Sequence, residues 1–327
     1  MSGHSCVISP RLKGTLSHAS GGKYGRMFPN LAPLTIDDRM LQTLSRSGSS
    51  MDLPAAAFED PASDNGRIPA GFPFFGQFVA HDLTRDPSLL HHHAALKELQ
   101  NFRTPRLDLE VVYGAGALVH PYFYDLHDPD KFLIGVNDAG QPDDVPRNTQ
   151  GQALIGDSRN DVHMIISQLH LAFLKFHNRI VDQLHQRGLR GDAALDEARR
   201  LATWHYQWIV VHEFLPLNVG EEMVEHIQHD GHLIYAFQGQ PFIPVEFADA
   251  AYRFGHPQIR TTYQLNDRAG GFTIFPDLAG MRPVPAARAI DWTWFFALPG
   301  RRPPQASKRI TARLAHSLID LPESIVG

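Results

Sequence analysis

The stretch RNDVHMIISQLHLAFLKFHNRIVDQLHQR, residues 159–187, decides the fold of this chain. Apolar residues recur in it at steps of three and four, which is the repeat of an amphipathic helix. They are Ile165, Leu169, Ala172, Phe173, Phe176, Ile180 and Leu184. Gly188 follows, and a glycine at this point can take the left-handed conformation that ends a helix. The sequence therefore predicts a long helix over residues 159–187 with one face in a core.

Outward from this helix, the pattern stays helical. A second helix is expected over residues 192–213, with apolar residues at three- and four-residue steps along it. Shorter helices are expected at 74–83, 221–229 and 246–256, while 101–114 is predicted as an extended loop and 121–155 as loop-rich. Strand signals are few. The expected fold is mainly α, a helical domain over residues 71–327 with long loops and little β structure, preceded by an irregular arm over residues 1–70.

The composition of the chain excludes several classes of partner and site. The chain has 327 residues, of which 43% are hydrophobic and 20% charged, as in a soluble protein with a sizeable core. A net charge of −5 without a basic block argues against nucleic acid and anionic membranes as partners. The sequence has no apolar run of about 18 residues, so no membrane span is expected. The single cysteine, Cys6, excludes an internal disulfide and cysteine-rich metal sites. Without an apolar signal core at the N-terminus, a cytoplasmic location is expected, with leaderless export as the alternative.

The segment GQFVAHDLT, residues 76–84, places a glutamine, a histidine and an aspartate close together. On a helix, Gln77 and His81 share a face because they are four residues apart. Asp82 points about 100° away from His81. One short helix is therefore predicted to serve two different sites.

Two other segments carry candidate functional residues. In GDSRND, residues 156–161, Asp157 is a plausible helix cap and Arg159 would lie in the first turn. A cation is disfavoured at the positive end of a helix dipole, so Arg159 is expected to pair with a carboxylate or to point into a pocket. In YRFGHPQI, residues 252–259, His256 stands between Gly255 and Pro257, which restrict where its imidazole points.

These segments together resemble a known family. GQFVAHDLT, GDSRND…LHLAFLKFHNRI and YRFGH occur in this order, with FLPLNVG (214–220) between the last two and PQASKRITARLAHSLIDLP (304–322) after them. The set resembles the animal-type haem peroxidases, in the bacterial branch of a superfamily that includes peroxinectin and myeloperoxidase. The resemblance covers about residues 70–322 and implies a haem-dependent peroxidase that reduces hydrogen peroxide and oxidises small organic or halide donors.

The resemblance also implies roles. His81 would be the distal base, Gln77 its neighbour, Arg159 the distal cation and His256 the proximal ligand of the haem iron. The residue types suit this chemistry. An imidazole can take a proton from one peroxide oxygen and return it to the other. A guanidinium stabilises the negative charge that develops as the O–O bond breaks.

A calcium loop is implied as well. The family places it where this chain has NFRTPRLDLEVVYG, residues 101–114. The ligands would be Asp82, Thr104, the carbonyl of Arg106, Asp108 and Glu110. The family has a small hydroxyl residue at the last of these positions, and a carboxylate there is also a good calcium ligand.

The chain departs from the family pattern in two places. Where mammalian members form haem esters, this chain has Ala80 and Val162, so haem b is expected to bind non-covalently, with Asp161 the nearest carboxylate. Chloride oxidation is accordingly not expected. The family also continues into a segment whose asparagine orients the proximal histidine and whose arginine holds a haem propionate. The 327 residues contain neither, so His256 is expected to lack that support.

Alternatives remain open. A fatty-acid dioxygenase of the same superfamily needs a tyrosine three positions before the proximal histidine, where this chain has Arg253, with Tyr252 one residue away. A haem- or calcium-binding adhesion protein without turnover is the second alternative. A non-haem metal site among the 19 histidines is the third, although no H-x-x-x-H pair with a nearby carboxylate supports it. For the triplet His91–His93, a polar loop or helix start is expected. The electron donor and the oligomeric state have no sequence signal.

Overall fold

The structure is a computed structural model. It describes residues 24–319 except 33, 55–56, 58–59, 86–100, 232–233, 236 and 238–239. Cys6 and the triplet His91–His93 lie outside the described residues, so the predictions for them stay predictions. Among the described residues, none of the helices combines the length and the apolar character that crossing a membrane requires.

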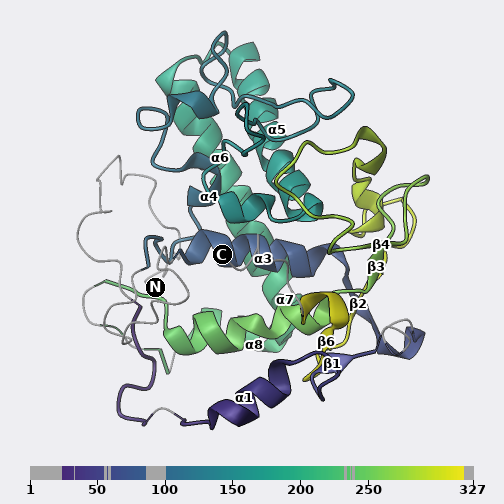
Figure 1. Cartoon of the computed structure of the whole chain (residues 1–327). Helices are drawn as coiled ribbons and strands as arrows, with labels where there is room; N and C mark the ends of the chain where they lie inside the picture. Colours follow the sequence, from purple (N-terminus) through teal and green to yellow (C-terminus); the bar gives the residue numbers. More distant parts are fainter. Residues whose placement is uncertain are drawn as a thin grey trace.

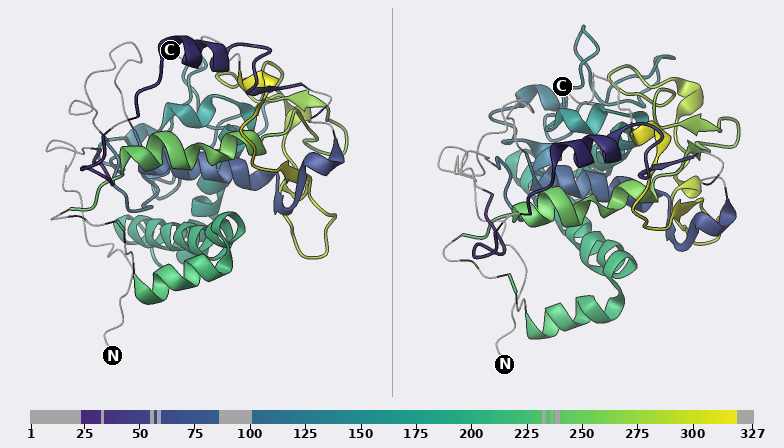
Figure 2. Two further views of the ribbon diagram at one scale, coloured as in Figure 1. Left: turned by 90° about the horizontal axis from the view of Figure 1, so that it is seen from below. Right: turned by 60° about the horizontal axis from the view of Figure 1, so that its bottom comes forward.

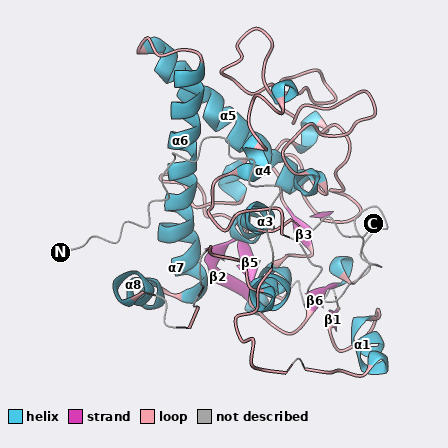
Figure 3. Cartoon of the chain, turned by 90° about the vertical axis from the view of Figure 1, so that its left-hand side faces the viewer, coloured by secondary structure: helices cyan, strands magenta, loops and turns pink. Residues whose placement is uncertain are grey.

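The two longest helices form the body of the fold. α5 (Met164–Gln186) and α6 (Asp192–Ile209) are joined by a short turn and lie against each other (Figure 1). Gly188 in this turn has φ 83°, the left-handed conformation that the sequence predicts. α6 continues through a π turn (Val210–Phe214) into α7 (Leu215–Val219), and α8 (Glu221–Asp230) lies at the foot of this column (Figure 3). The predicted helices over 192–213 and 221–229 are confirmed.

The predicted start of the long helix was five residues too early. Residues Ser158–Asp161 form a separate 3₁₀ turn, η5, and α5 begins at Met164. The helix is capped by His163, whose Nδ1 accepts the N–H of Ile166 at 3.2 Å. His163 also pairs with Ala279 in an isolated antiparallel bridge, which holds its backbone extended. This tertiary pairing, which no local pattern announces, separates the turn from the helix.

Helix α3 (Gly71–Leu83) occupies the centre of the molecule (Figure 1). It confirms the predicted helix at 74–83 and extends it by a turn at its start. Phe72, Phe75 and Phe78 pack into the core that α5 and α6 share, whereas Phe74 packs into a second core built by residues 259–295. A helix that is apolar on all sides must be buried, and α3 is held from several directions at once. This fixes the direction of its few polar side chains.

The helix expected at 246–256 is helical but not α. A π turn, η7 (Glu246–Ala250), passes into a 3₁₀ helix, η8 (Ala251–Gln258). Pro257 lies inside η8 and cannot donate a backbone hydrogen bond, which disfavours an α-helix here. The loop predicted over 101–114 also holds one short helix, α4 (Glu110–Tyr113). The remaining short 3₁₀ helices are Pro61–Ser63, Pro121–Phe123, Ala286–Arg288, Trp292–Trp294 and His316–Leu318.

The strands of the described residues are short and form three two-stranded sheets. β1 (Asp52–Leu53) pairs in parallel with β6 (Leu314–Ala315), β2 (Asp64–Pro69) pairs antiparallel with β5 (Ala306–Lys308), and β3 (Thr262–Tyr263) pairs antiparallel with β4 (Phe272–Thr273). The first two sheets fasten residues 52–69 to the end of the described chain. α1 (Asp38–Ser45) has no buried residue and lies at the periphery (Figure 2). The domain limits at residues 70 and 71 stay a prediction.

Candidate active site

A cavity of about 310 Å³ opens between α3, the turn before α5, and helices η7 and η8. Its volume is at the lower end of the range for small-molecule and cofactor sites. Gln77, His81, Arg159 and His256 all line it. The structure therefore brings the four residues predicted for the haem site into one cavity, although they come from three separate segments.

His81 lies on the buried side of this cavity. Its Nδ1 lies 2.6 Å from Oδ1 of Asn160, and Nδ2 of Asn160 lies 3.0 Å from Nδ1 of His170. With the amide in this orientation, Nδ1 of His81 donates its proton to Asn160, which leaves a lone pair on Nε2. Burial, and next the charge of Arg159, lower the pKa of His81 to about 4. The imidazole is therefore neutral at neutral pH and can accept a proton.

Arg159 lies two residues after its helix cap, Asp157. Asp157 accepts the backbone N–H of Arg159 at 3.0 Å, its Nε at 3.0 Å and its Nη2 at 2.8 Å. Nη2 also donates to the backbone oxygens of His81, at 3.1 Å, and Thr84. Burial opposes ionisation of Asp157, but the hydrogen bond and charge of Arg159 hold its pKa below the usual range. Within the described chain no hydrogen bond uses Nη1 of Arg159, so these donors remain for a ligand in the cavity.

Gln77 lies one turn before His81 and is held by a second histidine. Nε2 of His163 lies 2.8 Å from Oε1 of Gln77. His163 is only 2% exposed and also lines the cavity. Burial lowers its pKa to about 3, so it is neutral at neutral pH. No sequence pattern indicates this contact, because His163 looks like an ordinary residue of the long helix.

His256 reaches the cavity from η8. Its Nδ1 lies 2.9 Å from the backbone oxygen of Arg253, so Nδ1 donates and Nε2 keeps its lone pair. An imidazole in this tautomer is ready to bind a metal through Nε2, and a hydrogen bond from its other nitrogen is the usual support for such a ligand. In the structure a backbone carbonyl of its own helix is the acceptor for Nδ1, and the expectation about an asparagine partner stays a prediction.

The walls of the cavity are largely apolar, and Ala80 and Val162, the two positions where esters are formed in mammalian members, are among them. Neither can bond covalently to a cofactor. Asp161, the nearest carboxylate in sequence, lies outside the cavity lining and accepts two hydrogen bonds from Arg147, at 2.6 and 2.8 Å. The residues present fit haem: apolar walls for the porphyrin, one imidazole free to coordinate, and a second imidazole with a guanidinium nearby.

Asp82 points away from the cavity into the loop that follows, as the helical spacing predicts. Its two oxygens accept the N–H groups of Leu109, at 3.1 Å, and Val111, at 3.2 Å. Burial, and next the charge of Asp108, raise the pKa of Asp82 well above its ordinary value. One oxygen of Asp108 accepts from Thr104 at 3.0 Å, and the other is buried without a hydrogen-bond partner. A buried carboxylate, a half-buried one close to it and an unpartnered buried oxygen fit a bound cation.

The other two predicted calcium ligands have protein partners in the structure. Oε1 of Glu110 lies 3.1 Å from Nη1 of Arg103, and both side chains are buried. The backbone oxygen of Arg106 accepts from Nε2 of Gln207 at 3.4 Å. Arg103 also donates to Asp157 at 3.0 Å, so this arginine links the loop to the residue that holds Arg159. The sequence offered no signal for this link.

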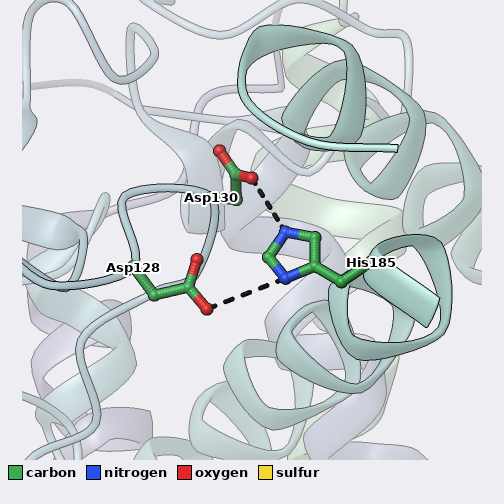
Figure 4. A group of neighbouring side chains, drawn as sticks. All are labelled: Asp128, Asp130 and His185. Carbon is green, nitrogen blue, oxygen red and sulfur yellow. Dashed lines mark hydrogen bonds and ion pairs between the residues drawn. The ribbon is translucent and has the colours of Figure 1, made fainter. Parts of the chain in front are cut away.

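A second group of possible metal ligands lies at the far end of α5. His185 lies between Asp130 and Asp128 (Figure 4). Its Nε2 lies 2.8 Å from a carboxylate oxygen of Asp130, and its Nδ1 lies 3.9 Å from a carboxylate oxygen of Asp128. Asp130 also accepts the N–H of Gly191 at 2.8 Å, and Nζ of Lys131 lies 3.1 Å from Asp128. Because the carboxylates have protein partners and an ammonium group lies beside them, the group is explained as an ion-pair cluster that ties a loop to α5.

Comparison with known proteins decides the family. The sequence model of the animal haem peroxidase family matches residues 91–279, more than half of the chain, and this range contains Arg159 and His256. The chain belongs to the animal haem peroxidase family. Membership implies haem as the cofactor. Peroxidasin from Drosophila melanogaster is 29% identical over 230 residues, which cover 64% of this chain and 14% of that protein. The chain thus spans only a small part of this relative.

Solved structures agree on the fold. Peroxidase A from Dictyostelium discoideum aligns with a TM-score of 0.60 at 13% identity, covering 91% of this chain and 67% of that one. The fatty acid α-dioxygenase of Oryza sativa aligns with a TM-score of 0.54 at 14% identity, covering 79% of this chain and 52% of that one. At these identities the likeness establishes the fold alone. The predicted mainly α, haem-peroxidase-like fold is confirmed.

Proposed function

We propose that this member of the family is a peroxidase that reduces hydrogen peroxide and oxidises small organic or halide donors. The observation that supports this most is the shared cavity, in which His256, with a free Nε2, lies with His81 and Arg159. Haem, when bound, would supply the redox chemistry. The residues of the chain would bind it, move a proton and stabilise charge.

In this proposal His256 holds haem through Nε2, while the apolar walls exclude water from the porphyrin. Val162 and Ala80 leave the haem without an ester, so it is bound non-covalently as haem b. The carbonyl of Arg253 keeps the proton on Nδ1 of His256 and so leaves the lone pair of Nε2, which would bind the iron. The binding free energy then comes from one coordination bond and from burial of the macrocycle.

His81 is the proton carrier. Its Nε2 accepts a proton from one oxygen of hydrogen peroxide and returns it to the other, so that water can leave. Asn160 holds the ring through Nδ1, so Nε2 is the nitrogen that takes up the proton and gives it back. The Nη1 donors of Arg159 stabilise the negative charge on the departing oxygen. Reduction of one peroxide to two waters consumes two protons and two electrons, the latter from the donor molecule.

Calcium is the second proposed ligand. Asp82 and Asp108, with Thr104, would hold it between α3 and the following loop. Leu107 and Leu109 on either side of Asp108 both have positive φ, 53° and 57°, so the loop adopts an unusual conformation around this carboxylate. Because Asp82 adjoins His81 on α3, a cation bound here would help to hold this helix, and with it His81, in position.

A haemin titration of the purified protein tests the proposal. A Soret band that saturates at one haem per chain, together with peroxide-dependent oxidation of guaiacol, supports it. Haem binding without turnover of any donor would favour the adhesion-type alternative. Oxygen uptake with linoleate would favour the dioxygenase alternative, for which Tyr252 lines the cavity; its hydroxyl, however, donates to the backbone oxygen of Gly76 at 3.2 Å.

A further inference from the structure

His163 is a buried polar residue of the cavity that the proposed chemistry does not use. It is almost fully buried, and its ring is held by the edges of two aromatic rings, those of Phe74 at 5.4 Å and Phe275 at 6.1 Å between centroids. Both ring nitrogens also make hydrogen bonds, one to Ile166 and one to Gln77. A side chain fixed in this way has a defined orientation, and its protonation state can be deduced from its partners.

One of the two hydrogen bonds of the His163 ring has a fixed direction, because a backbone N–H can only donate. The backbone N–H of Ile166 donates to Nδ1 of His163 at 3.2 Å, so Nδ1 must carry a lone pair. In a neutral imidazole the proton then lies on Nε2, which must donate to its own partner at 2.8 Å. That partner, Gln77, must present its carbonyl oxygen and not its amide nitrogen. The orientation of the glutamine amide, ambiguous in most proteins, is thereby set by a backbone hydrogen bond.

The fixed orientation of the Gln77 amide determines which of its groups a ligand in the cavity would meet. With Oε1 of Gln77 used by His163, the NH₂ group is the remaining end of the amide. Gln77 lines the cavity, and in the part of the chain that the structure describes no group accepts from its Nε2. The cavity therefore presents two hydrogen-bond donors beside His81: the amide NH₂ of Gln77 and Nη1 of Arg159. Donors in fixed positions select ligands that are acceptors only, such as small inorganic anions and deprotonated oxygens.

We propose that His163 is a positioning residue of the distal side, which locks the amide of Gln77 with its NH₂ group toward the ligand and so gives the cavity a preference for anionic acceptor ligands. This rests on the proposed function, because the ligand would be bound beside haem. The residue acts through Gln77 and does not touch the ligand. Asparagine is the substitution that separates its two roles. It can still cap α5 by accepting from Ile166, but it is too short to reach Gln77.

The first test needs no haem. Nitrogen-15 NMR of the haem-free protein reports which nitrogen of His163 carries the proton. We expect the Nε2–H tautomer at pH 7, with the exposed His229 as an internal reference. A proton on Nδ1, or a doubly protonated ring, would overturn the proposal, because the amide of Gln77 would then be free to turn. This result stands whether or not the protein proves to bind haem, so it separates failure of the lock from failure of the proposed function.

The second test measures the affinity of the haem-loaded ferric protein for fluoride by spectroscopic titration. Fluoride is an anion that only accepts hydrogen bonds. A hydrogen bond to a charged group contributes about 1.5–3 kcal/mol, so Gln77→Glu, which turns an oxygen toward the anion, should weaken fluoride binding by about tenfold or more. His163→Asn should weaken it by about threefold to tenfold. His205→Asn, at an exposed histidine, is the matched control. Unchanged fluoride affinity in His163→Asn, with a weakened Gln77→Glu, contradicts the lock.

Discussion

Nδ1 of His81 lies 2.6 Å from Oδ1 of Asn160, and the two residues come from segments 79 positions apart. Asn160 directly follows Arg159, so one turn of chain supplies both the cation of the cavity and the partner of its proton carrier. Asp157, at the start of the same turn, holds the guanidinium. The turn η5 therefore sets the relative positions of the groups that are proposed to act on peroxide.

Removal of the proton carrier should affect chemistry and spare haem. In His81→Ala, we expect peroxide cleavage to slow by about 10²–10⁴-fold, which is the usual contribution of a general acid–base residue. Haem affinity should stay within a few-fold because His256 is untouched. Stopped-flow measurement of the reaction with peroxide checks this. A rate within threefold of the wild type would show that His81 does not carry the proton.

Asn160→Ala should give a smaller effect through the orientation of the ring. Without its partner, the imidazole of His81 can rotate and change tautomer, so we expect about a tenfold slower reaction with peroxide. Asn160→Asp is the informative companion, since a carboxylate can still accept from Nδ1. It should restore most of the rate lost in Asn160→Ala, and equal rates in both variants would argue against a hydrogen-bonding role.

Calcium should stabilise the protein through the loop after α3. We expect its addition to the haem-free, chelator-treated protein to raise the melting temperature, because a ligand that binds only the folded state stabilises it. At a free concentration of about 100 times Kd the gain would be about 2.7 kcal/mol. Asp108→Asn should abolish the gain. Asp128→Asn, in the cluster at the end of α5, should keep it, and loss of the gain in this control would place the cation elsewhere.

The haem-free protein should lose stability in mild acid. Burial lowers the pKa of His163 and His170 to about 3 and that of His177 to about 4. In the unfolded chain these residues titrate near 6.5, so between pH 6.5 and about 4 the unfolded chain binds more protons than the folded one. The free energy of unfolding therefore falls as the pH falls, by about 2 kcal/mol per histidine at pH 5.

Urea unfolding at pH values from 7.5 to 5 measures this slope. In His170→Gln the slope should be smaller by about one proton, since the glutamine oxygen can still accept from Asn160 and no longer titrates. An unchanged slope in His170→Gln would mean that this imidazole is protonated in the folded protein.

The sequence predicts the local features of this structure better than those that depend on tertiary contacts. The apolar repeat in α5 and the Gly188 turn give two helices and their connection, because they are local properties. The spacing of Gln77, His81 and Asp82 likewise gives two directions on α3. The start of α5 does not follow from the sequence, because it depends on the pairing of His163 with Ala279 across the fold.

The site was predictable only through resemblance. Nothing local states that His256 reaches the cavity of His81, since the packing of η8 against α3 is a tertiary contact between distant segments. The supporting contacts were not predicted at all. Asn160 and Arg103 are ordinary polar residues in the sequence, and only the folded chain places them beside His81 and Glu110.

The central claim is that His256 binds the iron of a haem that lies in this cavity. The most direct measurement is the electronic and electron paramagnetic resonance spectrum of the ferric haem complex of His256→Ala, with and without added imidazole. We predict loss of the histidine-ligated spectrum, and its recovery when imidazole occupies the space left by the side chain. An unchanged ligand field in His256→Ala would contradict the account, because the iron would then be held by another residue.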